Sequence, residues 1–260
     1  MSWPSVRMTL RLRFVSTASA AGGLIAVLLI VGALFPAVGH TIGKLNIPSS
    51  VAQLLGGADY GTITGWFRSE IGSIYGPLVI GALAITGAVA STAGEEEDRI
   101  LTLLLGHPLA RARLVTARAL AIATIVIVIA AAALVGIVAG VAVGGGGITL
   151  GHMLAFAVQL AFFGLATGGI ALALGAGTGR RAFAAGIAAA LAILGWLING
   201  FAPVVSGLAW LKYFSIFYYY AGHDPLTQGI DVVGLLVLAA VAGAGTVIAV
   251  IAFERRDLRG

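Results

Sequence analysis

Six apolar runs of about 20 residues or more restrict the fold of this chain more than any other feature. Hydrophobic residues make up 60% of the sequence and charged residues 10%, against roughly 45–50% and about 25% in soluble proteins. A helix needs about 20 mainly apolar residues to cross a bilayer. A bilayer interior leaves unpaired backbone groups without water, so an isolated strand cannot replace a helix there. The sequence predicts an all-α integral membrane protein, a single domain over residues 1–260 with no room for a soluble enzyme domain.

Short polar or charged segments separate the apolar runs. The first run resembles a signal peptide, because arginines precede it and small residues follow it at Ala37–Gly39. It is longer than the apolar core of such peptides, which has about 7–15 residues, so an uncleaved helix is predicted. We expect transmembrane helices over residues 17–37, 71–93, 119–143, 149–174, 182–201 and 232–253.

Basic residues are distributed unequally between the two sides of these spans. One side holds 12 of the 15 Lys and Arg residues, and the other holds 3, namely Lys44, Arg68 and Lys212. Cytoplasmic segments are the ones enriched in Lys and Arg, so both termini are expected in the cytoplasm. The same rule explains the net charge of +5 without nucleic acid as a partner. The Gly- and Ala-rich composition, with Arg exceeding Lys, is typical of a GC-rich prokaryote and predicts its cell (inner) membrane as the location.

Two further segments are predicted to lie at the membrane surface. Residues 1–16 place arginines among apolar residues in a strand-like alternation, but a lone strand would leave its backbone unpaired, so an interfacial amphipathic helix is expected. Residues 202–231 carry many aromatic rings between Trp210 and Tyr220, and such rings prefer the headgroup level. This second segment is either an aromatic belt or a re-entrant element that covers a translocation path.

Residues 94–113, between the second and third spans, are densely charged. Glu95, Glu96, Glu97 and Asp98 begin the stretch, and carboxylates are favoured near a helix N-terminus. Apolar residues then recur at helical spacing until Pro108 ends the run. The sequence predicts a short amphipathic helix at the membrane surface that contacts another protein.

Several kinds of chemistry are absent from the sequence. It has no G-x-x-x-x-G-K-[ST] motif for ATP, no Cys, and four His residues scattered over separate segments, so we predict no catalytic residue, cofactor or metal site. The span interiors lack ionisable residues, which disfavours a proton-coupled carrier or a cation channel. Energy for uphill transport must then enter from outside the membrane, and the charged stretch is the expected contact. Substrate-binding residues cannot be identified from the sequence.

Regularly spaced glycines occur in the third and fourth spans. They are Gly136, Gly140 and Gly144 in the third and Gly164 and Gly168 in the fourth. Such spacing allows helix backbones to approach closely. The sequence leaves open whether these positions serve packing within the chain or contact with a second copy.

Three blocks of residues carry a family resemblance. The first has three acids, a Leu-rich run, Pro108 and an Arg-x-Arg pair, and departs from the family pattern at Arg99–Ile100. The second extends from Trp210 to Asp231, and the third is Phe253–Leu258. In their order and spacing these blocks resemble ABC-2 type permeases, the transmembrane subunits of ATP-binding-cassette exporters. The resemblance extends from the second span to the C-terminus, and the first seventy residues match only in layout.

The resemblance implies the type V exporter fold, with residues 1–16 as a connecting helix, 94–113 as a coupling helix region and 202–231 as outer re-entrant helices. It implies two permease subunits, expected as a homodimer, and two separate ATPase subunits that hold the ATP and Mg. The residues implied in coupling to the ATPase are Glu95, Glu96, Glu97, Asp98, Arg99, Leu101, Leu104, Leu105, His107, Pro108 and Arg111.

We therefore expect a non-enzymatic permease subunit that moves a hydrophobic or amphiphilic substrate, drug or lipid-like, outward at the expense of ATP on its partner. The spans lack polar anchors, which favours such a substrate over a sugar or an ion. The alternative is a membrane assembly or sensor subunit that does not transport and recruits a cytoplasmic partner through the same acidic helix.

Overall fold

The computed structural model of the protein describes residues 3–39, 60–98, 110–202 and 207–256, together with residues 41 and 205. Over these residues the chain is helical and contains no strand. Within this part of the chain, six helical stretches are long and apolar enough to cross a membrane. The predicted all-α membrane protein with six spans is therefore confirmed.

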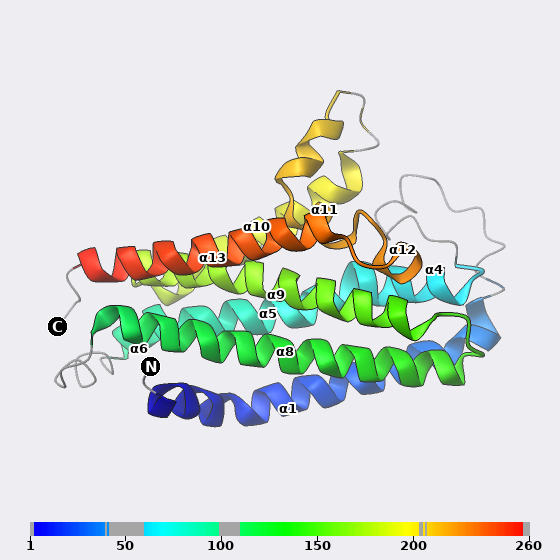
Figure 1. Cartoon of the computed structure of the whole chain (residues 1–260), viewed down its shortest axis with the longest axis horizontal. Coiled ribbons are helices and arrows are strands. Elements are labelled where there is room, and N and C mark those ends of the chain that lie inside the picture. Colours follow the sequence, from blue (N-terminus) through cyan, green and yellow to red (C-terminus); the bar gives the residue numbers. More distant parts are fainter. Residues whose placement is uncertain are drawn as a thin grey trace.

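The spans form one elongated bundle (Figure 1). α1 begins and α13 ends at the same end of this bundle, which we name the terminal end, and the opposite end is the distal end. Between α10 and α13 lie three short helices, η4 (Ala209–Phe214), α11 (Ile216–Ala221) and α12 (Pro225–Gln228). The spans are α1 (Trp3–Leu34) with η1 (Phe35–Gly39); α4 (Ile63–Phe67), η2 (Arg68–Tyr75), α5 (Gly76–Val89), η3 (Ala90–Gly94) and α6 (Glu95–Glu97) as one helical stretch; α8 (Arg111–Val143); α9 (Leu150–Thr178); α10 (Arg181–Phe201); and α13 (Val232–Arg255).

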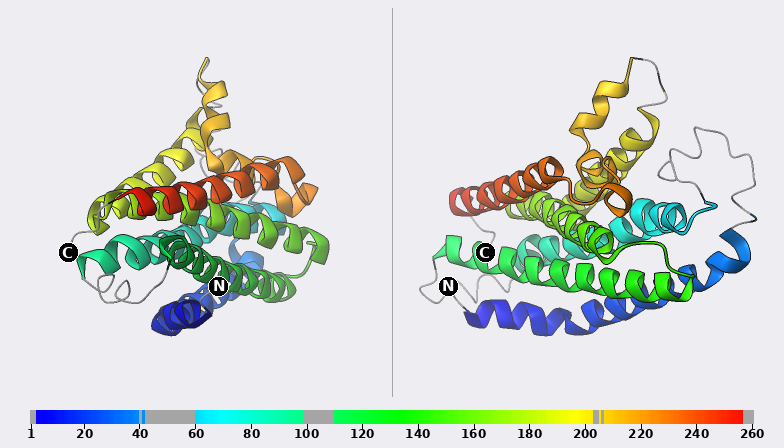
Figure 2. Two further views of the ribbon diagram at one scale, coloured as in Figure 1. Left: turned by 60° about the vertical axis from the view of Figure 1, so that its left-hand side comes forward. Right: turned by 45° about the vertical axis from the view of Figure 1, so that its right-hand side comes forward.

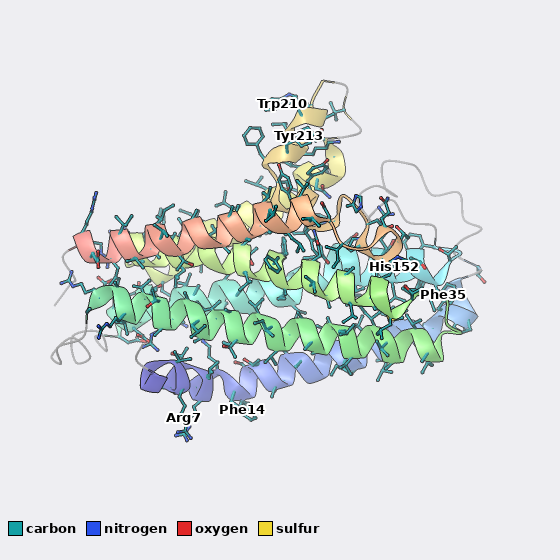
Figure 3. All side chains as sticks on the ribbon, viewed as in Figure 1. Arg7, Phe14, Phe35, His152, Trp210 and Tyr213 are labelled. Carbon is teal, nitrogen blue, oxygen red and sulfur yellow. The ribbon has the colours of Figure 1, made fainter. Side chains whose placement is uncertain are left out.

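The first span differs from expectation in its N-terminal part. The sequence predicted an interfacial helix over 1–16 and a span over 17–37, whereas α1 is a single α-helix of 32 residues. At about 1.5 Å per residue it is longer than the roughly 30 Å bilayer core. Val6 packs against Ala117 and Ala121 of α8, while Arg7 and Phe14 point away from the bundle (Figure 3). The N-terminal turns are therefore continuous with the span, and their outward side carries both charged and apolar side chains.

The second span contains wider π-helical turns next to a proline. The amide of Gly76 donates to the carbonyl of Ile71, five residues earlier, and Pro77 follows within the first turn of α5. A proline lacks the N–H group, and its ring clashes with the carbonyl four residues before it. A widened turn relieves that clash, so the helix passes Pro77 without ending.

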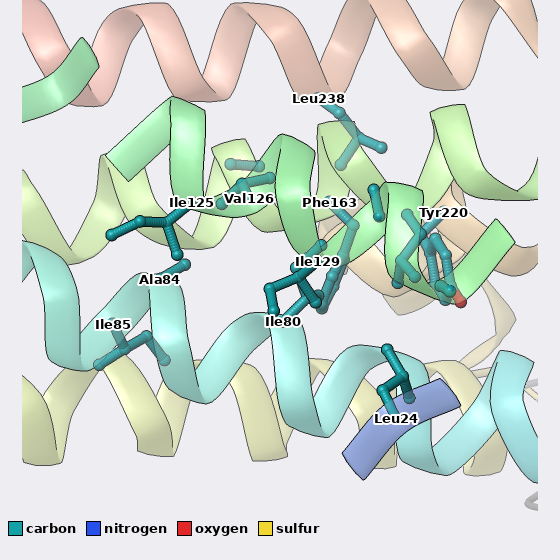
Figure 4. Close-up of a cluster of buried hydrophobic side chains, with 14 of the residues drawn as sticks. Leu24, Ile80, Ala84, Ile85, Ile125, Val126, Ile129, Phe163, Tyr220 and Leu238 are labelled. Carbon is teal, nitrogen blue, oxygen red and sulfur yellow. The ribbon is translucent and has the colours of Figure 1, made fainter. Parts of the chain in front are cut away.

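α9 occupies the centre of the bundle and packs against α5, α8, α10 and α13. α1 lies on the outside and packs mainly on α8, so that α1, α8, α9 and α13 follow one another across the bundle (Figures 1 and 2). α10 leans away from the others and forms, with η4, a hairpin that protrudes from the bundle. The buried core between α5, α8 and α9 includes Ile80, Ile129 and Phe163 (Figure 4).

Glycines determine how closely the spans approach. A methyl group added at Gly32 of α1 would overlap the backbone of Gly140 in α8, and one at Gly140 would overlap the backbone of Leu28. Gly169 of α9 and Gly245 of α13 also meet backbone to backbone. In lipid the hydrophobic effect does not drive helices together. Close van der Waals packing of this kind therefore supplies the attraction between them. The glycine repeat of the third span therefore serves packing within the chain.

Two alanine substitutions on α1 test this packing. Gly32→Ala should lower the free energy of unfolding by about 1–3 kcal/mol, because the new methyl group overfills the contact with α8. Gly22→Ala, on the same helix with no atom near the added methyl group, should leave stability unchanged or raise it through helix propensity. Unfolding in mixed micelles with increasing sodium dodecyl sulfate measures both. Equal stability of the two variants would contradict the assigned packing.

Candidate functional site

The acidic residues Glu95, Glu96 and Glu97, which we name the acidic clamp, end the helical stretch of the second span. The sequence predicted that they begin a new helix, but α6 follows η3 without a break and the Asp98 amide donates to the Gly94 carbonyl at 2.9 Å. Carboxylates are disfavoured at a helix C-terminus because the backbone dipole is negative there. Positive groups from other helices offset this disadvantage.

Glu95 binds an arginine within the bundle. Its Oε2 accepts from Arg118 Nη2 at 2.8 Å, and the Arg118 side chain is only 3% exposed. The same guanidinium donates through Nη1 to the Thr9 hydroxyl of α1. Arg118 lies two turns inside α8 and is surrounded by apolar residues, so its charge requires a partner. Glu95 thereby connects the second span to α8 and, through Arg118, to α1.

Glu96 binds the C-terminal end of the last span. Its carboxylate, with a side chain 4% exposed, pairs with the Arg256 guanidinium, which also donates to the Ala176 carbonyl of α9 at 3.1 Å. Arg111, at the start of α8, donates to the Arg256 carbonyl at 3.0 Å. This network joins the ends of the second span, α8, α9 and α13 around one buried carboxylate.

Glu97 binds the first turn of α10. Its Oε1 accepts from the backbone amide of Arg181 at 2.9 Å. Arg180, the N-cap residue of α10, makes no capping hydrogen bond of its own, so the Glu97 carboxylate takes the place of the missing cap. A negative charge is also favoured at a helix N-terminus. Three consecutive acids thus hold three different partners.

The structure places the predicted coupling residues in two groups. Glu95 and Glu96 face arginines of the same chain, Glu97 binds the Arg181 amide, Arg111 joins the network of Arg256, and Asp98 is exposed. The remaining predicted residues, Arg99, Leu101, Leu104, Leu105, His107 and Pro108, lie outside the described residues.

Sequence reasoning missed the partners of the acidic clamp. Arg118 and Arg181 were interpreted as indicators of orientation, Arg256 as one of these and as part of the third resemblance block, and Thr9 was not singled out. One signal was present, because Arg118 directly precedes a long apolar run and a charge at such a position needs a counter-ion. Which acid supplies it depends on how the helices pack.

The acidic clamp is a set of ion pairs and hydrogen bonds between helix ends. Its charged groups are engaged with one another, and among the described residues no three His, Cys, Asp or Glu side chains come together as a metal site. The ion pairs of Glu95 and Glu96 are largely buried, and buried charge pairs are screened less by salt than exposed ones. The three carboxylates therefore bind α8, α10 and the end of α13 directly, and they connect to α1 and α9 through Arg118 and Arg256.

A family model described as ABC-2 family transporter protein matches residues 14–258, nearly the whole chain. A search of curated proteins gives no match.

The Glu96 pair is expected to carry a large share of the clamp's stability. Glu96→Gln should lower the free energy of unfolding by about 1.5–3 kcal/mol, the range for hydrogen bonds to charged groups. Asp98→Asn, which changes an exposed acid two residues away, should change it by less than about 0.5 kcal/mol.

Combining Glu96→Gln with Arg256→Gln provides the control. Because the two residues contact each other, the double variant should be more stable than the sum of the single effects predicts. Unfolding in mixed micelles gives the coupling energy between the two residues. If the effects of the two single substitutions simply add, Glu96 and Arg256 do not stabilise each other.

Proposed function

Since the chain belongs to the ABC-2 family of transporter proteins, we propose that it is the permease subunit of an ATP-driven exporter powered by a separate ATPase subunit. The observation that carries the proposal is the acidic clamp, which binds α8, α10 and the end of α13 directly and connects to α1 and α9 through Arg118 and Arg256. A soluble ATPase that binds the segment after Glu97 has a direct mechanical connection to the bundle. The absence of a phosphate-binding motif in the sequence is consistent with ATP and Mg on that partner.

The proposed mechanism starts with two copies of the chain and two ATPase subunits. ATP binding draws the ATPase subunits together, and each displaces the coupling helix region 94–113 of its permease. The clamp passes this displacement to α1, α8, α10 and α13. The two permeases then open a path outward for a hydrophobic or amphiphilic substrate, drug or lipid-like. The exposed apolar faces of α10 and α13, which include Leu191, Ile193 and Leu236, are available for the second copy or for lipid.

The proposed orientation places the terminal end in the cytoplasm of a prokaryotic cell and the distal end outside. Most basic side chains that the structure describes lie near the terminal end, on α1, α8, α10 and α13. Arg68 begins η2 of the second span, and Lys212 lies in η4 on the protruding hairpin. This asymmetry favours a cytoplasmic terminal end.

Disruption of the coupling helix region tests the function. Leu104→Asp should abolish co-purification of the ATPase and ATP-dependent transport, because a charge replaces an apolar side chain on the predicted contact face. The unfolding curve of the purified permease should not change. Leu208→Asp, the same substitution at an exposed distal position, should leave ATPase association intact. Normal coupling by a folded Leu104→Asp permease would refute the proposal, and ATPase binding without ATP-dependent transport would favour the non-transporting alternative.

Labelling of single cysteines tests the orientation. The chain contains no Cys, so Arg180→Cys and Leu208→Cys each introduce one reactive thiol at an exposed position at opposite ends. A membrane-impermeant maleimide should label Leu208→Cys in intact cells and Arg180→Cys only after permeabilisation. The reverse pattern would invert the proposed topology.

A further inference from the structure

Two cavities adjoin each other in the distal half of the bundle. One has a volume of about 250 Å³ and is lined by polar and apolar residues, with Arg68, Lys212 and Asp224 as its charged members. The other has a volume of about 330 Å³ and lies between α5 and α10, where nearly all lining residues are apolar. Ser73, Trp196 and Phe217 line both. The two therefore form one site with a polar head and an apolar extension, the usual design of a small-molecule pocket.

The polar cavity has an excess of positive charge. Arg68 Nη1 donates to Asp224 Oδ2 at 2.9 Å, so the Asp224 carboxylate neutralises the charge of Arg68. Lys212 Nζ lies 5.2 Å from the ring centroids of Tyr213 and Tyr218. In the part of the chain that the structure describes, no carboxylate is within ion-pair distance of Lys212. The aromatic faces orient this ammonium group but do not neutralise it.

Two residues that line the same cavity each carry a buried polar atom that has no hydrogen-bond partner among the described residues. These atoms are the Tyr220 hydroxyl and Asp224 Oδ1, whose residues are 1% and 5% exposed. Tyr220 packs between Phe163 and Phe217 (Figure 4), and burial raises the pKa of its hydroxyl well above the ordinary value. It therefore stays a neutral donor. Buried polar groups are nearly always satisfied in native structures, so both atoms point to a ligand.

The geometry points to a binding site for an amphiphile with a phosphate head group, whose apolar chain lies in the groove between α5 and α10. Phosphate oxygens accept from Lys212 and Tyr220, and the hydroxyl of a monoprotonated phosphate donates to Asp224 Oδ1. A cationic head would meet Lys212 unfavourably, and a neutral one would leave it without a counter-charge. This inference rests on the proposed permease function and assigns a chemical class to its substrate.

Binding is measured with the full-length permease alone in nanodiscs of phosphatidylcholine, with radiolabelled dodecyl phosphate as the probe. Saturable binding is expected. Dodecyltrimethylammonium should not displace the probe, because it has the same chain with the opposite charge. Inorganic phosphate at the same concentration should not displace it either, because it lacks the chain. Displacement by either competitor at equal concentration would overturn the assignment.

Substitutions in the polar cavity identify the head-group site. Lys212→Gln should weaken binding of dodecyl phosphate about tenfold or more, the effect of one hydrogen bond to a charged group. Arg7→Gln, which removes a positive charge from an exposed position on α1, should not change it. Equal affinity of Lys212→Gln and the unmodified chain would exclude Lys212 as the head-group ligand.

Tyr220→Phe separates ligand binding from stability. It should also weaken binding about tenfold, whereas the melting temperature without ligand should stay the same or rise, because an unpaired buried hydroxyl has been removed. Retained affinity in this variant, or a lower melting temperature, would contradict the role assigned to the hydroxyl.

Filling the groove tests the site of the apolar chain. Ala192→Phe places a ring inside the groove and should weaken binding of dodecyl phosphate, whereas Ala190→Phe, on the exposed face of the same helix, should not. Equal affinity of the two variants would remove the groove from the site. Because no ATPase takes part, failure to bind overturns this inference alone, and failure of ATP-dependent transport overturns the proposed function alone.

Discussion

Carboxylates that end a helix inside a protein cannot remain without a counter-charge, and this constraint organises the terminal end of the bundle. Glu95 and Glu96 stand where the helix dipole disfavours them and where little water reaches them. Arg118 and Arg256 supply the compensating charge from α8 and from the end of α13. Glu97 satisfies the first turn of α10 in the same region. Four spans, the second span itself with α8, α10 and α13, therefore meet at three consecutive residues.

Close backbone contacts complement these ion pairs along the length of the bundle. The hydrophobic effect that drives the packing of soluble proteins is weak between helices already in lipid, so shape must supply the attraction. Gly32 and Gly140 allow α1 and α8 to touch, and Gly169 and Gly245 do the same for α9 and α13. α10 lacks a comparable contact, leans away from the others and leaves space between itself and α5. The tight contacts form a rigid part, and the looser α10 borders the cavities.

The aromatic stretch between Trp210 and Tyr220 contains both exposed and buried rings. Trp210, Tyr213 and Phe214 are exposed on the protruding hairpin (Figure 3), as an aromatic belt would be. Phe217 and Tyr220 are buried against Phe163 in the core. Neighbouring rings thus serve different purposes, because α11 turns one of its faces to α9. Composition alone does not reveal this division, since every ring in the stretch satisfies the same preference for an interface.

Sequence by itself determined the class of the protein, the number of spans and their approximate limits, because the length and polarity of a span are local properties imposed by the bilayer. It also located the acidic stretch and its resemblance to a permease family. Only the tertiary structure decided that Glu95 to Glu97 end a helix, that their partners are Arg118, Arg256 and the Arg181 amide, and that Tyr220 faces a cavity. Those facts depend on contacts between residues far apart in the chain. Hydropathy and periodicity indicate which environment each segment needs. Only the packing of the helices determines which residue pairs with each buried charge.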